Sequence, residues 1–179
     1  MRKRLYVLTG LGFAMAAISA GLAVASATGG PIVRTPEQNI MVPNALEAST
    51  MHFEPAAVSV KSGGTVTFVD SESDEPHTVT VVNRSELPRT QAQVNNCAAC
   101  RLALGHLKNP RNPENSPIKT YVLDRGAKGF DARGDSVFLA PKGPHKRATV
   151  TVTAPAGTTL YYVCAVHPWM QGQINVITG

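Results

Sequence analysis

The chain has 179 residues, of which 43% are hydrophobic and 16% charged. This length suits one domain with flanking segments, and the composition argues against a wholly disordered chain. The formal net charge is +5, but Arg2, Lys3 and Arg4 stand at the N-terminus, so the rest of the chain carries only about +2 (5 − 3). So small a positive charge argues against nucleic acid as a partner.

Residues 1–27 have the pattern of an export signal. A basic start is followed by an uncharged stretch from Leu5 to Ala27, which ends in small residues. The apolar run is long for a signal peptide, and about 20 apolar residues are enough to span a membrane. A cleaved signal peptide and a retained N-terminal anchor through residues 5–27 are therefore both open. In either case we expect an exported protein, in the periplasm, outside the cell or held at the cell envelope.

The remainder predicts a β domain. Residues 28–50 contain Gly29, Gly30, Pro31 and Pro36, and we interpret them as a linker leading into a first strand. From residue 51 onward, short stretches alternate apolar and polar residues, as half-buried strands do. The clearest lie around the glycine turn of "AAVSVKSGGTVTFVD" and at 77–82, 147–154, 159–164 and 173–177, with weaker ones at 119–123 and 136–140. We expect an all-β sandwich or barrel over 51–179.

An insertion interrupts this rhythm at about residues 83–146. It is rich in proline, and "AACRLALGHL" within it predicts a short helix. Residues 84–147 carry twelve Lys or Arg against five Asp or Glu. A long excursion of this kind in a compact β domain is usually functional or ordered.

The three cysteines are Cys97, Cys100 and Cys164, and an odd number leaves at least one of them outside a disulfide. In an exported protein, Cys97 and Cys100 favour a local disulfide that braces the insertion. A second metal site with His106, and free or redox-active thiols, remain alternatives. A c-type haem site is excluded because Arg101, not His, follows Cys100.

The C-terminal motif Cys164-x-x-His167-x-x-Met170 brings a thiol, an imidazole and a thioether into one turn. Thiolate and thioether favour copper, and a Cys/His/His set with a weak axial Met is the blue-copper arrangement. His77 is the best candidate for the second imidazole, because it follows a proline at a loop-to-strand junction. The other histidines are His52, His106 and His145, which we interpret as surface or locally satisfied residues. The alternative to a metal site is ordinary packing of a buried Cys and Met.

Three stretches together resemble the cupredoxins, and among them the amicyanin and plastocyanin group. They are "FEPAAVSVKSGGTVTFVD", "EPHTVTV" and "LYYVCAVHPWMQGQINV", and the similarity covers roughly residues 50–83 and 147–179. The resemblance implies a Greek-key β-sandwich, one type 1 copper ion held by His77, Cys164, His167 and Met170, and one-electron transfer without enzymatic chemistry. Family members usually carry Asn after the first ligand His, where this chain has Thr78, whose backbone N–H could still reach the Cys164 sulfur.

The resemblance therefore favours an exported blue copper protein that passes single electrons between partners. No charged residue occurs from Ala148 to Gly179, so we expect transient redox proteins to dock on an apolar patch near His167, Pro168 and Trp169. The acidic stretch at 70–75 or the basic insertion could steer their encounter. A copper carrier or store without an electron-transfer role, and a metal-free sandwich used for adhesion or assembly, are the other functions considered.

Overall fold

A computed structural model of the protein describes residues 29–71, 74–108 and 117–179. The predicted signal peptide or anchor, residues 1–27, lies outside these described residues. No helix within the described ranges combines the length and apolar character needed to cross a membrane.

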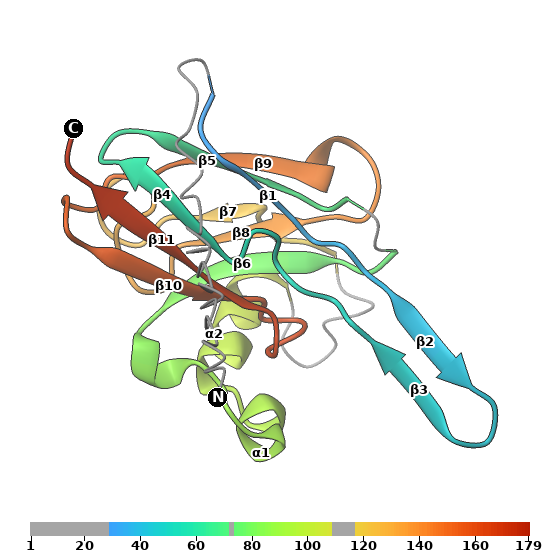
Figure 1. Ribbon diagram of the computed structural model, residues 1–179. Helices are drawn as coiled ribbons and strands as arrows, with labels where there is room; N and C mark the ends of the chain where they lie inside the picture. The colour runs from blue at the N-terminus through green and yellow to red at the C-terminus, as the bar shows by residue number, and fades with distance from the viewer. Residues whose placement is uncertain (1–28, 72–73, 109–116) are drawn as a thin grey trace, which may run out of the picture.

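The described strands form two main sheets, which confirms the predicted β-sandwich (Figure 1). The smaller sheet has the order β1 (Ile32–Arg34), β5 (Thr65–Val69), β9 (Arg147–Thr151). The larger has the order β4 (Ala57–Lys61), β11 (Gln171–Ile177), β10 (Thr159–Val163), β6 (His77–Val82), β8 (Ser136–Leu139), β7 (Val122–Leu123). Pairing is antiparallel except that β1 runs parallel to β5, and β4 to β11.

The core lies between the two sheets. Because successive side chains of a strand point to opposite faces, the alternating apolar residues of β4, β5, β10 and β11 all reach this space. Tyr162 on β10 is fully buried and packs edge-on against Phe53 and Phe68, with ring centroids 5.0 and 5.5 Å apart. Such edge-to-face pairs are favoured by the charge distribution of the rings. These three rings join the larger sheet to the smaller one.

The insertion is shorter than the predicted range 83–146. Strand β8 falls within that range but pairs with β6, from His77 opposite Leu139 to Thr80 opposite Ser136, and all four of its residues are buried. Its sequence "SVFL" does not alternate, because both faces of this strand are covered, so the sequence signalled it only weakly. The part without sheet structure holds η1 (Arg84–Glu86), α1 (Gln91–Asn95) and α2 (Ala98–Leu107), and a second short turn, η2 (Pro144–Lys146), precedes β9.

Helix α2 confirms the predicted short helix and covers the outer face of the larger sheet. Cys97, Ala99, Cys100 and Ala103 pack in one apolar cluster together with Val82, Val163 and Ala165. The neighbouring residues Val81, Tyr162 and Cys164 belong instead to the core between the sheets. The two clusters therefore lie on opposite faces of the same strands, and the insertion covers the part of the outer face formed by β6 and β10.

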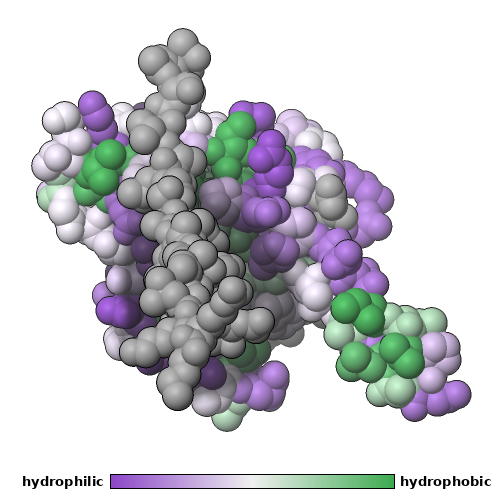
Figure 2. Space-filling view, in the orientation of Figure 1, coloured by the Kyte–Doolittle hydropathy of each residue, from purple (hydrophilic) through white to green (hydrophobic). Residues whose placement is uncertain are grey.

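Residues 28–50 form more strand than the predicted linker and first strand. After β1, strands β2 (Asn39–Val42) and β3 (Leu46–Ser49) pair as a two-stranded hairpin. Figure 1 shows this hairpin projecting away from the sandwich. Its tip exposes Ile40, Met41, Val42 and Leu46, which form the apolar end seen in Figure 2.

Candidate metal centre

Strand pairing brings the predicted ligands to one end of the sandwich. His77 is the first residue of β6, and Cys164 directly follows the last residue of β10. These two strands are antiparallel neighbours, with Thr80 opposite Val163. The beginning of one strand therefore lies beside the end of the other, and the two side chains meet although 87 residues separate them.

The three ligating atoms converge on one point. The Cys164 Sγ atom lies 3.8 Å from His77 Nδ1 and 3.9 Å from His167 Nδ1, and the two Nδ1 atoms are 3.3 Å apart. His77 and Cys164 are fully buried, and His167 is 8% exposed. Within the described part of the chain, these residues make the single cluster of three or more His, Cys, Asp or Glu that could hold a metal ion. One sulfur and two imidazole nitrogens around a shared point suit copper.

Met170 closes the ligand loop immediately before β11. Its backbone N–H donates to the His167 carbonyl at 2.9 Å, and its carbonyl accepts from the Cys164 N–H at 3.0 Å. These bonds hold Met170 beside both residues, and its side chain is 1% exposed. His77, Cys164, His167 and Met170 thus form the arrangement typical of a type 1 copper site.

Burial keeps the imidazole rings of His77 and His167 in the neutral form that binds a metal. Desolvation, with a smaller contribution from His167, lowers the pKa of His77 to about 4. Desolvation also lowers the pKa of His167. Both rings are therefore neutral near pH 7, the form in which a histidine ligates.

For the Cys164 thiol, burial favours the protonated form, which does not bind a metal. Burial raises the pKa of Cys164, although backbone N–H groups oppose this rise. The N–H groups of Thr78 and His167 point at the sulfur from 3.3 and 3.4 Å. Without a metal the thiol keeps its proton, and metal binding would release it. The predicted hydrogen bond from the Thr78 backbone N–H to the Cys164 sulfur is confirmed.

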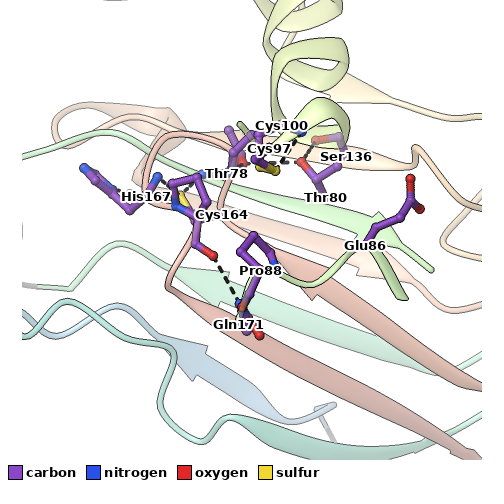
Figure 3. Close-up of a disulfide and its surroundings, with 12 residues drawn as sticks. Thr78, Thr80, Glu86, Pro88, Cys97, Cys100, Ser136, Cys164, His167 and Gln171 are labelled. Atoms are coloured by element: carbon purple, nitrogen blue, oxygen red, sulfur yellow. Dashed lines mark hydrogen bonds between the residues drawn. A yellow bond between two sulfur atoms is a disulfide. The ribbon is translucent and has the colours of Figure 1, made fainter. Parts of the chain in front are cut away.

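The Thr78 side chain joins the two ligand-bearing segments. Its hydroxyl accepts a hydrogen bond of 2.6 Å from the N–H of Ala165, the residue after Cys164. It also lies 3.3 Å from the Thr80 hydroxyl, which is 2.7 Å from that of Ser136 (Figure 3). A threonine thus crosslinks the loops at a position where family members usually carry Asn. Nothing in the sequence indicated this role for the hydroxyl.

The other histidines lie elsewhere and are exposed. The Nδ1 atom of His52 is 2.7 Å from the Thr50 carbonyl oxygen. The ring of His106 contacts Arg125, and the ring of His145 stacks on Tyr121 with centroids 3.4 Å apart. The structure therefore selects His77 from the four candidates.

Cys97 and Cys100 form a disulfide, and Cys164 is a free, buried thiol. The alternative second metal site with His106 is not formed. The disulfide was one of the states that the sequence allowed for this pair.

Trp169 is the exposed member of the predicted patch, at 49%, and its ring centroid lies 5.2 Å from that of His167. Ala165, two residues before His167, is buried. A cleft of about 520 Å³ borders His167 on another side, and its lining includes Leu104 and Lys108 of the insertion. Asp70 is also buried, so the acidic stretch 70–75 is not wholly a surface feature. Sequence reasoning missed the contribution of α2 to the walls of the site.

Several solved structures are similar to this chain at low identity. Reduced auracyanin from Roseiflexus castenholzii is 16% identical with a TM-score of 0.43, and the match covers 84% of this chain and 98% of that one. A purple cupredoxin from Nitrosopumilus maritimus is 16% identical with a TM-score of 0.41, covering 82% and 98%. A mutant fern plastocyanin is 16% identical with a TM-score of 0.41, covering 81% and 98%.

The family comparison covers most of the chain. Residues 40–177 match the copper binding proteins of the plastocyanin/azurin family, and this range includes the whole ligand set. No curated protein matches the sequence. The chain belongs to the plastocyanin/azurin family of copper-binding proteins, the cupredoxins, and its buried site is a copper site.

Proposed function

We propose that this protein is an exported type 1 copper protein that transfers single electrons between redox partners and catalyses no substrate chemistry. The observation that carries the proposal is the convergence of the His77, His167 and Cys164 ligating atoms in a buried site. Bound copper supplies a Cu(II)/Cu(I) couple. His77, Cys164 and His167 would be the strong ligands and Met170 the weak axial one.

The protein's own groups suit this role because they fix the ligands in place. The two N–H bonds to the Cys164 sulfur favour the thiolate and set its direction. Thr78 ties the Cys164 loop to β6, and the backbone bonds of Met170 close that loop. A ligand set held from several sides changes little between oxidation states, which favours fast electron transfer.

We place the electron's route at His167 and Trp169. Cys164 and His77 are fully buried, whereas His167 reaches the surface beside the exposed Trp169 ring. The uncharged residues around them would suit small, transient contacts with redox proteins. The N-terminal pattern supports export, with residues 5–27 as a cleaved signal or a membrane anchor.

Copper titration of the metal-free protein tests the site. We expect an intense blue thiolate-to-copper absorption band and narrow copper hyperfine splitting in the EPR spectrum. Cys164→Ala and His77→Ala should abolish the blue band, whereas the matched control His52→Ala should keep it. Met170→Leu should remain blue with a higher reduction potential, since a weak donor to Cu(II) is lost. A blue Cys164→Ala protein would remove this thiol from the site.

Voltammetry separates the electron carrier from a copper carrier or store. An electron carrier should give a reversible one-electron wave and release copper slowly to a chelator. Rapid release without a reversible wave would favour copper delivery. No colour change on copper addition would favour the metal-free sandwich.

A further inference from the structure

The Cys97–Cys100 disulfide lies where a helix stabilises a thiolate. Cys97 is the N-cap of α2, and its Sγ atom accepts a hydrogen bond of 3.2 Å from the N–H of Cys100. The first turn of α2 carries no acidic residue that would repel a negative sulfur. A helix N-terminus lowers the pKa of a cysteine in a Cys-x-x-Cys pair, and a thiol of low pKa is a good leaving group. Cys97 is therefore suited to be released as a thiolate.

A surface cleft borders Cys97. The cleft measures about 300 Å³, and its lining includes Pro88, Ala92, Gln93 and Cys97 but not Cys100. Cys97 is 7% exposed and Cys100 3%. A thiolate that enters the cleft would therefore reach Cys97 rather than Cys100.

The disulfide contributes little to the stability of the folded insertion. It joins residues only three apart, so it closes a short loop and removes little entropy from the unfolded chain. Docking of α2 on the sheet depends instead on the apolar cluster with Val82, Val163 and Ala165. A structural role therefore explains this pair poorly.

We propose that Cys97–Cys100 is a thiol–disulfide exchange site for a partner protein that carries a dithiol. A partner thiolate attacks the Cys97 sulfur, the Cys97–Cys100 bond breaks, and Cys100 leaves as a thiolate that takes up a proton. The second partner thiolate then attacks the partner sulfur of the mixed disulfide and releases Cys97, which is also protonated. Two electrons and two protons pass from the partner dithiol, which becomes a disulfide. Copper is neither oxidised nor reduced in this exchange.

The exchange site is connected to the copper loop. The Nε2 atom of Gln171, the residue after Met170, donates to the carbonyls of Pro88 at 2.6 Å and Pro168 at 3.2 Å (Figure 3). Pro88 lines the cleft. In addition, Val163 and Ala165, on either side of Cys164, pack in the same cluster as the disulfide. A partner in the cleft would therefore touch a wall that is hydrogen-bonded to the ligand loop.

The test uses the full chain loaded with Cu(I), which cannot oxidise the probe, and repeats the measurement without copper. Reduced thioredoxin serves as the protein dithiol, and mass spectrometry of alkylated peptides counts the thiols at Cys97 and Cys100 separately from Cys164. We expect the pair to be reduced without denaturant in both forms. Cys100→Ser should trap a mixed disulfide between Cys97 and a thioredoxin whose second active-site cysteine is replaced by serine and whose remaining cysteine is activated as an aryl disulfide, with the aryl thiolate as the leaving group.

Two matched variants test the cleft. Ala92→Trp, at an exposed position in the cleft wall, should slow reduction by thioredoxin at least tenfold. Leu102→Gln, on the exposed face of α2 outside this cleft, should leave the rate unchanged. A pair that stays oxidised until denaturant is added would overturn the exchange site. An unchanged rate in folded Ala92→Trp protein would overturn the assignment of the cleft. Since the copper-free form is measured as well, failure here is distinguishable from failure of the copper proposal.

Discussion

The hydroxyl of Thr78 accepts the backbone N–H of Ala165 at 2.6 Å, in a fully buried setting. This bond joins the residue after one ligand to the residue after another, because Thr78 follows His77 and Ala165 follows Cys164. The backbone N–H of the same threonine points at the Cys164 sulfur. One residue thus fixes both the spacing of the two segments and the environment of the sulfur.

Thr78→Val should destabilise the fold while leaving the blue band. The change leaves the buried Ala165 N–H without its acceptor, which typically costs about 1–3 kcal/mol. The backbone N–H to the sulfur is retained, so copper should still bind in the blue form. Urea unfolding of the copper-free protein measures the loss, and Thr78→Ser, which keeps a hydroxyl, should recover most of it. Equal stability of the Val and Ser variants would show that the bond contributes nothing.

Gly172→Ala should disturb the core beneath the copper loop. Gly172 on β11 lies opposite Tyr162 on β10, and a Cβ atom there would come within 2.4 Å of the tyrosine ring. Tyr162 is fully buried, so the ring can move only by displacing its neighbours, and overpacking of this kind costs typically about 1–3 kcal/mol. Thermal unfolding would measure it. Gly29→Ala, where nothing lies within 4 Å of the added atom, is the control and should have little effect.

The metal-free protein should lose stability as the pH falls below the pKa of a free histidine. The pKa of His77 drops from 6.5 to about 4 because the ring is buried. Above pH 6.5 the His77 ring is neutral in both the folded and the unfolded chain. Below pH 6.5 the ring is protonated in the unfolded chain, whereas in the folded chain it stays neutral until about pH 4. This difference amounts to about 2 kcal/mol lost by about pH 5, and the lowered pKa of His167 acts in the same direction.

Urea unfolding at about pH 7.5 and about pH 5 measures this loss, in a range above the titration of most carboxylates. The variant His77→Phe has no titrating ring at this position and should show a smaller pH dependence. A dependence as steep as in the parent protein would assign the effect to other groups.

Trp169→Lys should slow electron exchange between reduced and oxidised copies of the protein. If both copies meet through the patch around His167, the substitution places two positive charges face to face. Repulsion of this kind should reduce the rate by about tenfold at low ionic strength, and salt should weaken the effect. NMR line broadening of the Cu(I) protein on addition of the Cu(II) protein measures the rate.

Leu102→Lys is the matched control, because it adds the same charge at a comparably exposed position on α2, 52% against 49%. Its exchange rate should stay close to that of the parent protein. If both variants slow exchange equally, the effect comes from net charge, and docking near Trp169 is contradicted.

Much of the copper site was predictable because it is local in the chain. Cys164, His167 and Met170 fall within one turn between two strands, and ligand type alone points to copper. The alternation of apolar residues in β4 and β5 is equally local, since it reflects the two-residue repeat of a strand. His77 was selected from four histidines by its place at the start of a strand.

Other features depend on contacts between distant segments. The pairing of β6 with β10 decides that His77 meets Cys164, and the position of α2 decides that Leu104 and Lys108 line the same cleft as His167. Strand β8 was only weakly signalled, because a strand covered on both faces has no alternation to detect.

The sequence by itself determined the identity of the ligands and the class of fold, because residue chemistry and strand periodicity are properties of short stretches. The tertiary structure alone decided that the Thr78 hydroxyl joins the two ligand-bearing segments and that Cys97 lines a surface cleft. Hydrogen bonds and packing between segments some 80 residues apart have no local pattern, since they exist only after the strands have paired.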